Sequence, residues 1–247
     1  MKRITAIALF TVPVLLLAAS TPASGVLTPQ LLSPDAAYAY YKTAYTNTVG
    51  LLESVPFTST ENVYSSTGRV QGHRTLTVDS VGNSSYSDTS TGTAVRRGAY
   101  QYISIDSYEL SENYSLLTTL AKSKRTKYLR APIAANVVPA ARPLSAYAVD
   151  ALATDIPSMT AGEVSLSTTA TGSVLSWPAR GDSKVWEGTY QVTIRQGLIV
   201  DSRLVSPKKK AIHSFTYKLN PSPVRAPSGP YVEWSSVISS PLYKPVR

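Results

Sequence analysis

The chain contains no cysteine, and this absence removes several kinds of chemistry at once. Disulfide bonds, thiolate metal sites, cysteine nucleophiles and the lipidated cysteine of a bacterial lipoprotein are all excluded. Histidine is nearly absent as well, since only His73 and His213 are present. Both histidines fall in predicted strands, so a catalytic triad, a histidine metal site or a two-histidine acid–base pair has too few residues to draw on.

Recognisable enzyme motifs are also missing. Residues 206–209 (SPKK) match the S-x-x-K nucleophile motif, but they fall in a turn between predicted strands and lack the S-D-N and K-T-G companions. Carboxylates are scattered along the chain, so their spacing suggests no glycosidase dyad. We therefore expect a protein that is not an enzyme, with no catalytic residue, no metal and no cofactor.

The N-terminus has the three-part pattern of a secretory signal peptide. Lys2 and Arg3 precede an apolar stretch at residues 4–19, and small residues continue to position 25. The apolar stretch is shorter than the about 20 residues that a membrane-spanning helix needs. We expect residues 1–25 to be cleaved. Residues 26–247 then form a single domain that is secreted or works in the periplasm and cell envelope.

Positive charge exceeds negative charge in this chain. The formal net charge is +9, and loss of Lys2 and Arg3 with the signal peptide lowers it by two, to +7. An exported protein rarely meets nucleic acid, so we assign the charge to anionic envelope surfaces or to solubility. Five cations form one basic run: Lys122, Lys124, Arg125, Lys127 and Arg130. Such a run is typical of a solvated face or turn, and the alternative is contact with an anionic head group or membrane surface.

The residue pattern predicts one amphipathic helix followed by many strands. Residues 33–35 (SPD) have the form of a helix start, and the apolar spacing continues to about Leu52. Short β-branched and aromatic runs then predict up to five strands between residues 58 and 106. Residues 107–162 contain repeated prolines and should form short helices and loops. Strands resume at Glu163 and continue to Leu219, and residues 231–238 are expected to add an edge strand.

The order of these parts resembles a known superfamily. Three strand phrases carry the likeness: residues 95–103 (VRRGAYQYI), 127–132 (KYLRAP) and 188–194 (GTYQVTI). They resemble the LolA-like periplasmic carriers of lipids and lipoproteins, in particular the actinobacterial LppX and LprG type. The resemblance implies an α+β fold in which a curved antiparallel sheet, or half-barrel, has covering helices over a cavity for acyl chains. The chain lacks the lipobox cysteine of LppX and LprG and in this respect is similar to soluble LolA.

Three functional hypotheses remain. The first is a non-enzymatic binder or carrier of lipid-like ligands, the second is an envelope interaction, sensor or regulatory module on the same fold, and the third, least favoured, is a secreted hydrolase. The carrier would be a monomer whose partner is a lipid or other amphiphile. Its cavity would be lined by Tyr40, Tyr41, Tyr45, Leu76, Val78, Tyr190, Val192, Ile194, Phe215 and Tyr217. Alternatively, these side chains fill the core and leave no cavity. A filled core together with a conspicuous exposed patch would favour the interaction module.

Overall fold

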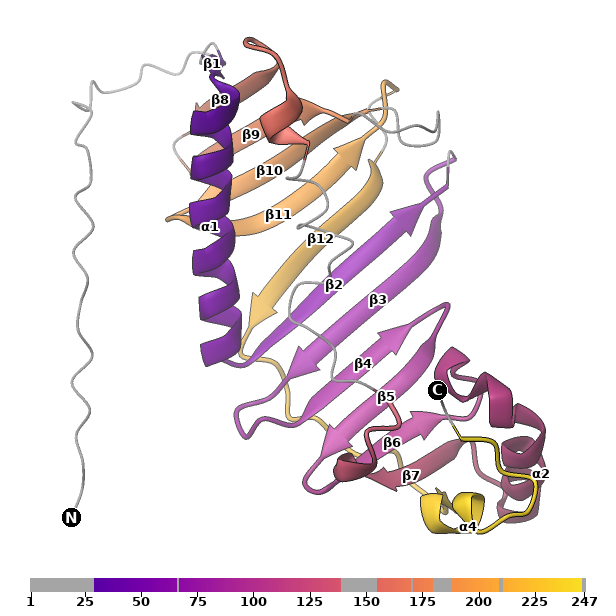
Figure 1. The fold of residues 1–247 in the computed structure, drawn as a ribbon. Coiled ribbons are helices and arrows are strands. Elements are labelled where there is room, and N and C mark those ends of the chain that lie inside the picture. Colours follow the sequence, from indigo (N-terminus) through magenta and orange to yellow (C-terminus); the bar gives the residue numbers. More distant parts are fainter. Residues whose placement is uncertain are drawn as a thin grey trace, which may run out of the picture.

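The computed structural model describes residues 29–65, 67–138, 155–169, 171–179, 188–208 and 211–245. The expected signal peptide lies outside these residues. Within them, no helix combines the length and the apolar character needed to cross a membrane. Figure 1 shows a single broad sheet, with a long helix near one end and short helices near the other.

The sheet has 13 strands in the order β1-β8-β9-β10-β11-β12-β2-β3-β4-β5-β6-β7-β13. Their bounds are β1 Gln30–Leu32, β2 Phe57–Tyr64, β3 Val70–Val78, β4 Ser84–Asp88, β5 Gly92–Arg97, β6 Tyr100–Ser104, β7 Tyr128–Pro132, β8 Val164–Thr169, β9 Gly172–Pro178, β10 Thr189–Arg195, β11 Leu198–Val205, β12 Ala211–Leu219 and β13 Val232–Glu233. Neighbouring strands are antiparallel except for β7 and β13, which are parallel. The open, curved sheet with covering helices is the predicted α+β half-barrel.

The long helix α1 (Pro34–Ser54) begins as its sequence predicts. The Ser33 side chain accepts a hydrogen bond from the Ala36 N–H at 3.3 Å, and Pro34 occupies the first turn. Residues buried against the sheet recur every three or four positions, at Ala37, Tyr41, Ala44, Thr48 and Leu52. The Thr48 hydroxyl also accepts a hydrogen bond from the Ile199 N–H of β11 at 2.8 Å. The expectation that this helix packs across one face of the sheet is confirmed.

Two stretches differ from the sequence prediction. Residues 107–162, where the proline pattern predicts helices and loops, contain the strand β7, which matches the strand phrase at residues 127–132. They also contain α2 (Tyr114–Lys124) and the 3₁₀ helices η1 (Tyr108–Asn113), η2 (Ile133–Ala135) and η4 (Ile156–Ser158). Pro132 ends β7, where a missing N–H is tolerated. Residues 231–238 form only the short β13 and then α4 (Trp234–Ile238), because Trp234 and Val237 pack into the core beside α2.

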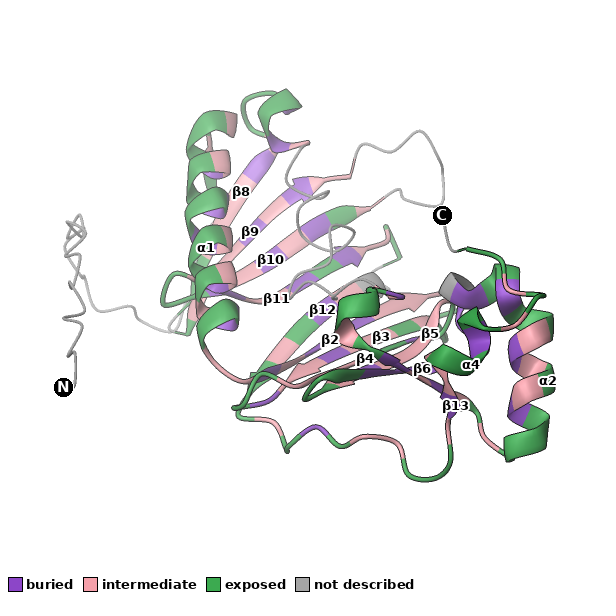
Figure 2. Cartoon of the chain, turned by 60° about the horizontal axis from the view of Figure 1, so that its bottom comes forward, coloured by how far each residue is buried: buried purple, intermediate pink, exposed green. Residues whose placement is uncertain are grey.

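Hydrophobic residues gather in two separate clusters on the helix-bearing face of the sheet. The first lies under α1 and is centred on β8 to β12, and the second joins β6, β7, α2 and α4. Figure 2 shows the two sets of helices at opposite ends of the sheet. Between them, the polar side chains of Glu61, Arg74 and Asp88 pair across β2, β3 and β4. The helix-bearing face is therefore apolar at both ends and polar in the middle.

Candidate functional site

Nine of the ten predicted ligand-binding residues pack together in the cluster under α1. Tyr41, Leu76, Tyr190, Val192, Ile194 and Phe215 are buried there, and Tyr45, Val78 and Tyr217 pack against them. Tyr40 is the exception, because its side chain is 36% exposed. One helical residue corresponds to about 100° of rotation, so Tyr40 lies on the flank of α1 when Tyr41 faces the sheet. The strand alternation therefore located this set well, although whether it binds a ligand stays a prediction.

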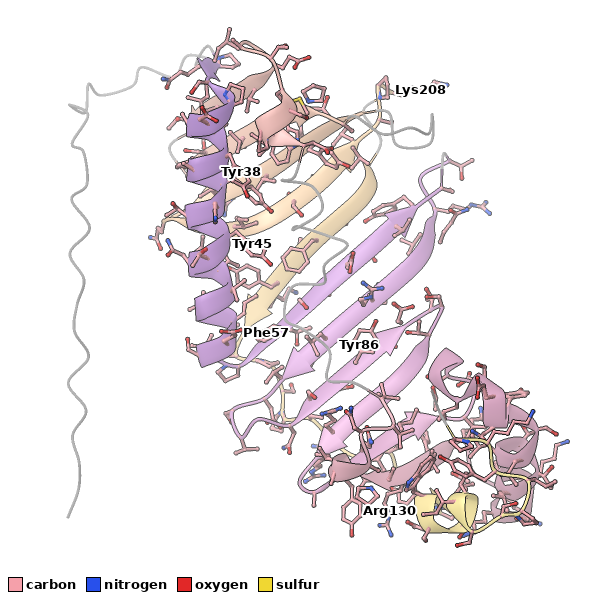
Figure 3. The ribbon with its side chains drawn as sticks, in the orientation of Figure 1. Tyr38, Tyr45, Phe57, Tyr86, Arg130 and Lys208 are labelled. Carbon is pink, nitrogen blue, oxygen red and sulfur yellow. The ribbon has the colours of Figure 1, made fainter. Side chains whose placement is uncertain are left out.

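Aromatic rings form the centre of this cluster. Tyr41 lies 6.2 Å from Tyr45 in a stacked arrangement and 6.0 Å from Trp177 in an edge arrangement, measured between ring centroids. Trp177 in turn lies 5.5 Å from Tyr190 and is fully buried. Figure 3 shows Tyr45 extending from α1 over the sheet. Burial raises the pKa of the Tyr190 and Tyr217 hydroxyls, so both stay neutral at physiological pH.

The middle of the same face carries a ladder of charges. Arg74 of β3 donates to Glu61 of β2 at 3.0 Å and to Asp88 of β4 at 2.7 Å. Tyr86 donates to Asp88 at 3.1 Å, and the Ser90 backbone N–H donates to it at 2.7 Å. Burial acts to raise the pKa of Asp88, but hydrogen bonds from Ser90 and Arg74 outweigh it and hold that pKa well below its ordinary value. Asp88 is therefore a fixed anion.

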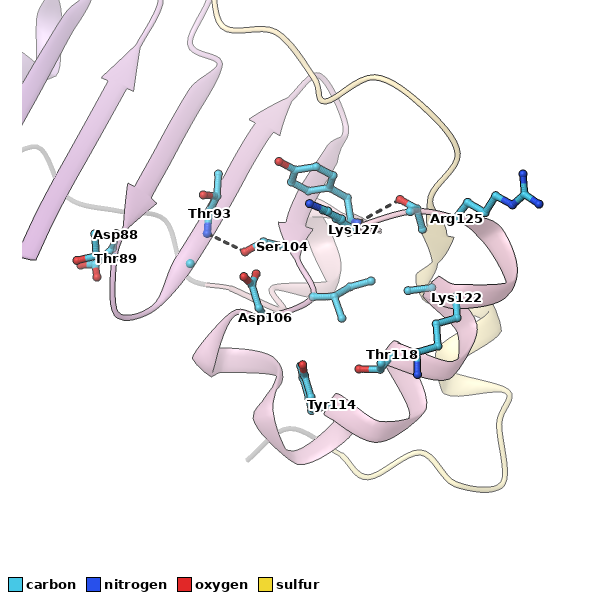
Figure 4. A pocket seen from close by; sticks show the side chains of 15 residues that line it. Asp88, Thr89, Thr93, Ser104, Asp106, Tyr114, Thr118, Lys122, Arg125 and Lys127 are labelled. Atoms are coloured by element: carbon cyan, nitrogen blue, oxygen red, sulfur yellow. Dashed lines mark hydrogen bonds between the residues drawn. The ribbon is translucent and has the colours of Figure 1, made fainter.

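A pocket of about 680 Å³ lies where this ladder meets α2. One face of α2 and its C-cap contribute Tyr114, Thr118, Ala121, Lys122 and Arg125, and the strands and turns opposite contribute Asp88, Thr89, Gly92, Thr93, Ser104, Ile105, Asp106, Thr126, Lys127 and Tyr128 (Figure 4). Gly92 has a φ of +91°, and a Cβ atom there would lie 2.6 Å from the Ser104 hydroxyl. Ser104 itself accepts from the Thr93 N–H at 2.8 Å. These contacts hold the floor of the pocket in place.

The basic run divides between the two faces of the sheet. Lys122, Arg125 and Lys127 all line the pocket, whereas Lys124 and Arg130 do not. Arg130 follows Leu129, which is buried beside α2, so strand alternation turns Arg130 to the opposite face. Three of the five cations in the basic run therefore line the same pocket.

Arg130 has a structural role on that opposite face. Its guanidinium lies 2.8 Å from the Glu233 carboxylate and over the rings of Tyr100 and Tyr231, at 5.0 and 5.5 Å from their centroids. The hydrogen bond to Glu233 raises the pKa of Arg130. These contacts attach β13 to β7. They account for the presence of Arg130 without a ligand, and its contact with a head group stays a prediction.

The lining of the pocket has an excess of positive charge. Three cations line it, Lys122, Arg125 and Lys127, against two carboxylates, Asp88 and Asp106. Asp88 is ion-paired with Arg74, which it shares with Glu61. Among the residues that the structure describes, none of Lys122, Arg125 and Lys127 forms an ion pair. In that same part of the chain, no group of three or more histidine, aspartate or glutamate side chains is placed to hold a metal. The pocket is therefore suited to an anionic group.

Comparison with known proteins finds similarity to solved structures only in the fold. No family model and no curated protein matches the chain. Two of the matching structures are the Pseudomonas aeruginosa MucA/MucB complex and MucB in complex with MucA(peri), with 15% and 14% identity and TM-scores of 0.33 and 0.32. Each match covers 76% of this chain, but only 59% and 57% of the other chains, so this chain spans less than two thirds of their length. Similarity at this level assigns no function, and the likeness to LolA-like proteins stays a resemblance in architecture.

Proposed function

We propose that this protein is an exported, non-enzymatic interaction module of the cell envelope, which binds its partner on the helix-bearing face of the sheet. The observation that carries this proposal is the packing under α1. Tyr41, Trp177 and Tyr190 contact one another in a row, in the position where a carrier would need space for an acyl chain. Aromatic pairs of this kind add to the stability gained by burying their area.

The charge ladder further favours an interaction module over a lipid carrier. An acyl chain gains about 0.8 kcal/mol for each buried CH₂ only where the wall is apolar. In the middle of the face an acyl chain would instead meet the guanidinium of Arg74, whose side chain is 27% exposed between the nearly buried carboxylates of Glu61 and Asp88. The middle of the face therefore suits a polar partner. The adjacent pocket, with its unpaired cations, offers that partner a charged anchor.

Site-specific photo-cross-linking in the envelope of the source organism tests the proposal. A photoreactive phenylalanine at Lys127, on the pocket rim, should give a discrete adduct with a partner. The matched control position is Ser87, which is exposed on β4 and points away from the helix-bearing face because its neighbour Asp88 points toward it. No adduct, or equal adducts from both positions, would contradict a binding surface on the helix-bearing face.

Native mass spectrometry of the purified mature protein separates this function from the carrier. We expect the protein mass without a bound lipid, because the aromatic side chains under α1 occupy the space between helix and sheet. Stoichiometric lipid that survives purification would establish the carrier and reject the interaction module. The variant Trp177→Ala, which opens space among these rings, serves as a control that the method detects a lipid when a cavity is present.

A further inference from the structure

The residues that follow α4 are held to the rest of the fold by few contacts. Residues 240–245, which we call the strap, belong to no helix or strand and run from α4 past α2 (Figure 1). The side chain of Leu242 is 71% exposed and Lys244 is exposed too, so Tyr243 supplies the apolar contact between the strap and the fold. A segment with so little buried apolar area opens at a small cost in free energy.

One side-chain amide fastens the backbone of the strap. The Asn113 Nδ2 donates to the Lys244 carbonyl at 2.8 Å, and the Lys244 N–H donates to the Asn113 Oδ1 at 2.9 Å. Among the residues that the structure describes, these two hydrogen bonds are the ones that join the strap to an element other than α4 and its own turn. An amide that pairs with the N–H and the C=O of one residue recognises a backbone and not a side chain.

The helix next to Asn113 does not account for this side chain. Asn113 occupies the N-cap position of α2, where asparagine commonly accepts a hydrogen bond from an N–H group of the helix. Its side chain forms no such cap, and it is 3% exposed, with both polar atoms directed at the strap. Without a backbone in this place, two buried polar atoms would lose their partners. The site around Asn113 is therefore built to hold a polypeptide backbone.

An aromatic contact lies beside the backbone contact. Tyr243 directly precedes Lys244, and its ring meets the ring of Trp234 in α4 edge to face, with centroids 5.6 Å apart and planes at 88°. Both rings pack against the cluster that joins β6, β7, α2 and α4. The site thus holds two adjacent features of an extended chain, an aromatic side chain and the backbone of the next residue. Any extended segment with an aromatic residue in that position offers the same two features.

The strap site adjoins the pocket on the helix-bearing face. Asn113 directly precedes Tyr114, a residue of the pocket lining whose side chain is 51% exposed. A partner that reaches the pocket therefore meets the strap as well. A segment of the partner that replaced the strap would restore the hydrogen bonds of Asn113 and the contact with Trp234, so the exchange would leave no buried polar atom without a partner.

We propose that the strap fills a binding site for an extended segment of a partner protein, and that this segment displaces the strap when the partner binds. The segment carries an aromatic residue that contacts Trp234 and, directly after it, a residue whose backbone pairs with Asn113. The proposal rests on the proposed function, because it states how the partner of the interaction module is held. The strap is then an autoinhibitory element, which occupies the site when no partner is bound.

Fluorescence polarisation with a labelled peptide of residues 239–245 (SSPLYKP) measures this exchange on the full mature chain. In the unaltered protein the attached strap competes at a high effective concentration, so the free peptide should bind weakly. The variant Tyr243→Ala removes the ring of the strap from its contact with Trp234, and affinity for the peptide should rise at least about tenfold. Equal affinity of the two proteins, or no binding to either, would show that the strap is a fixed part of the fold and overturn the proposal. Circular dichroism checks that the variant is folded.

Changes in the peptide separate the two features without altering the protein further. An N-methyl group on Lys244 removes the N–H that pairs with Asn113 and should weaken binding at least about tenfold, whereas Lys244→Ala keeps the backbone and should change affinity less than about twofold. Tyr243→Ala in the peptide should weaken binding as the N-methyl group does. Leu242→Ala should not, because that side chain is 71% exposed. Control peptides that lose as much affinity as their counterparts would contradict the assignment.

Photo-cross-linking connects the strap site with the partner of the proposed function. With the photoreactive phenylalanine at Lys127, Tyr243→Ala should increase the yield of the partner adduct at least about twofold, because the strap no longer competes for the site. Leu242→Ala is the matched control and should leave the yield unchanged. An adduct whose yield is the same in both variants would reject the strap as a competitor and leave the interaction module standing. Peptide binding without any adduct would reject the module and leave the strap site standing.

Discussion

Ser202 is a buried hydroxyl that the fold does not use. The side chain is fully buried, and its Oγ has no hydrogen-bond partner among the residues that the structure describes. Ser202 lies on β11, opposite Val192 of β10 on one side and Phe215 of β12 on the other. It therefore faces the apolar cluster under α1. An unsatisfied buried hydroxyl costs about 1–3 kcal/mol. Ser202→Ala should therefore raise the free energy of unfolding by about 1 kcal/mol in urea titrations, with an unchanged m-value.

Thr48 provides the control for this prediction. Its hydroxyl is equally buried but has two partners, the Ala44 carbonyl at 2.7 Å and the Ile199 N–H at 2.8 Å. Thr48→Val should lower the free energy of unfolding by about 1–3 kcal/mol, because the Ile199 N–H is left unpaired. If Ser202→Ala destabilises the protein as Thr48→Val does, the Ser202 hydroxyl has a partner in solution.

The sequence predicted residues well where local spacing decides their environment. Alternation along β10 placed Tyr190, Val192 and Ile194 in one core, and the structure confirms that placement. The same reasoning did not separate Lys127 from Arg130, because the Glu233 partner of Arg130 is 103 residues away in the chain. The pocket therefore appears only when α2 and the ends of the strands are brought together.

At the scale of elements, local signals specified the helix α1 and the strands linked by short turns. The predicted helix over about 35–52 is Pro34–Ser54, and the five strands expected between 58 and 106 are β2 to β6. The residue pattern missed β7, which only the family resemblance treated as a strand phrase at residues 127–132, and it missed most of the C-terminal segment. These elements depend on each other, because β13 pairs in parallel with β7 across about a hundred residues of chain. Such pairing leaves no short-range pattern to detect.

The charge ladder joins three of these strands and should make the protein sensitive to acid. Since the pKa of Asp88 lies below its ordinary value of 3.8, the stabilisation is complete above that value and is lost as the pH falls through the lowered pKa. We expect the free energy of unfolding to decrease as the pH falls from about 5 to 2. Asp88→Asn should lower it by about 2 kcal/mol at neutral pH and flatten this decrease. Chemical denaturation at a series of pH values measures both effects.

Asp106→Asn is the matched control for the acid prediction. Asp106 is exposed and forms no ion pair with any residue that the structure describes, so the change should leave the free energy of unfolding nearly unaltered. A pH profile of Asp88→Asn that has the same slope as that of the unaltered protein would show that the ladder is not the source of acid sensitivity.

On the scale of the whole molecule, one continuous sheet supports two large hydrophobic cores on its helix-bearing face, and a smaller cluster of Val95, Tyr102 and Val224 lies on the opposite face. The face that bears the helices is apolar under α1 and again under α2, and the opposite face is rich in hydroxyl pairs such as Thr58 with Thr77 at 2.9 Å. An open sheet of this size exposes one face to water over much of its length. The exposure of this face accounts for the abundance of serine and threonine in the chain. The two cores on the helix-bearing face are connected mainly through the backbone of β2 to β5.

This arrangement predicts that the two ends of the sheet lose structure separately. Leu117 of α2 and Leu175 of β9 are both fully buried, one in each cluster, and leucine-to-alanine changes at such sites cost about 2–5 kcal/mol. Leu117→Ala should accelerate amide hydrogen exchange in α2 and β7 while β10 stays protected, and Leu175→Ala should do the reverse. Mass spectrometry of native-state exchange measures this. Equal acceleration at both ends in each variant would show that the sheet unfolds as one cooperative unit, in which case the pocket beside α2 has the full stability of the molecule behind it.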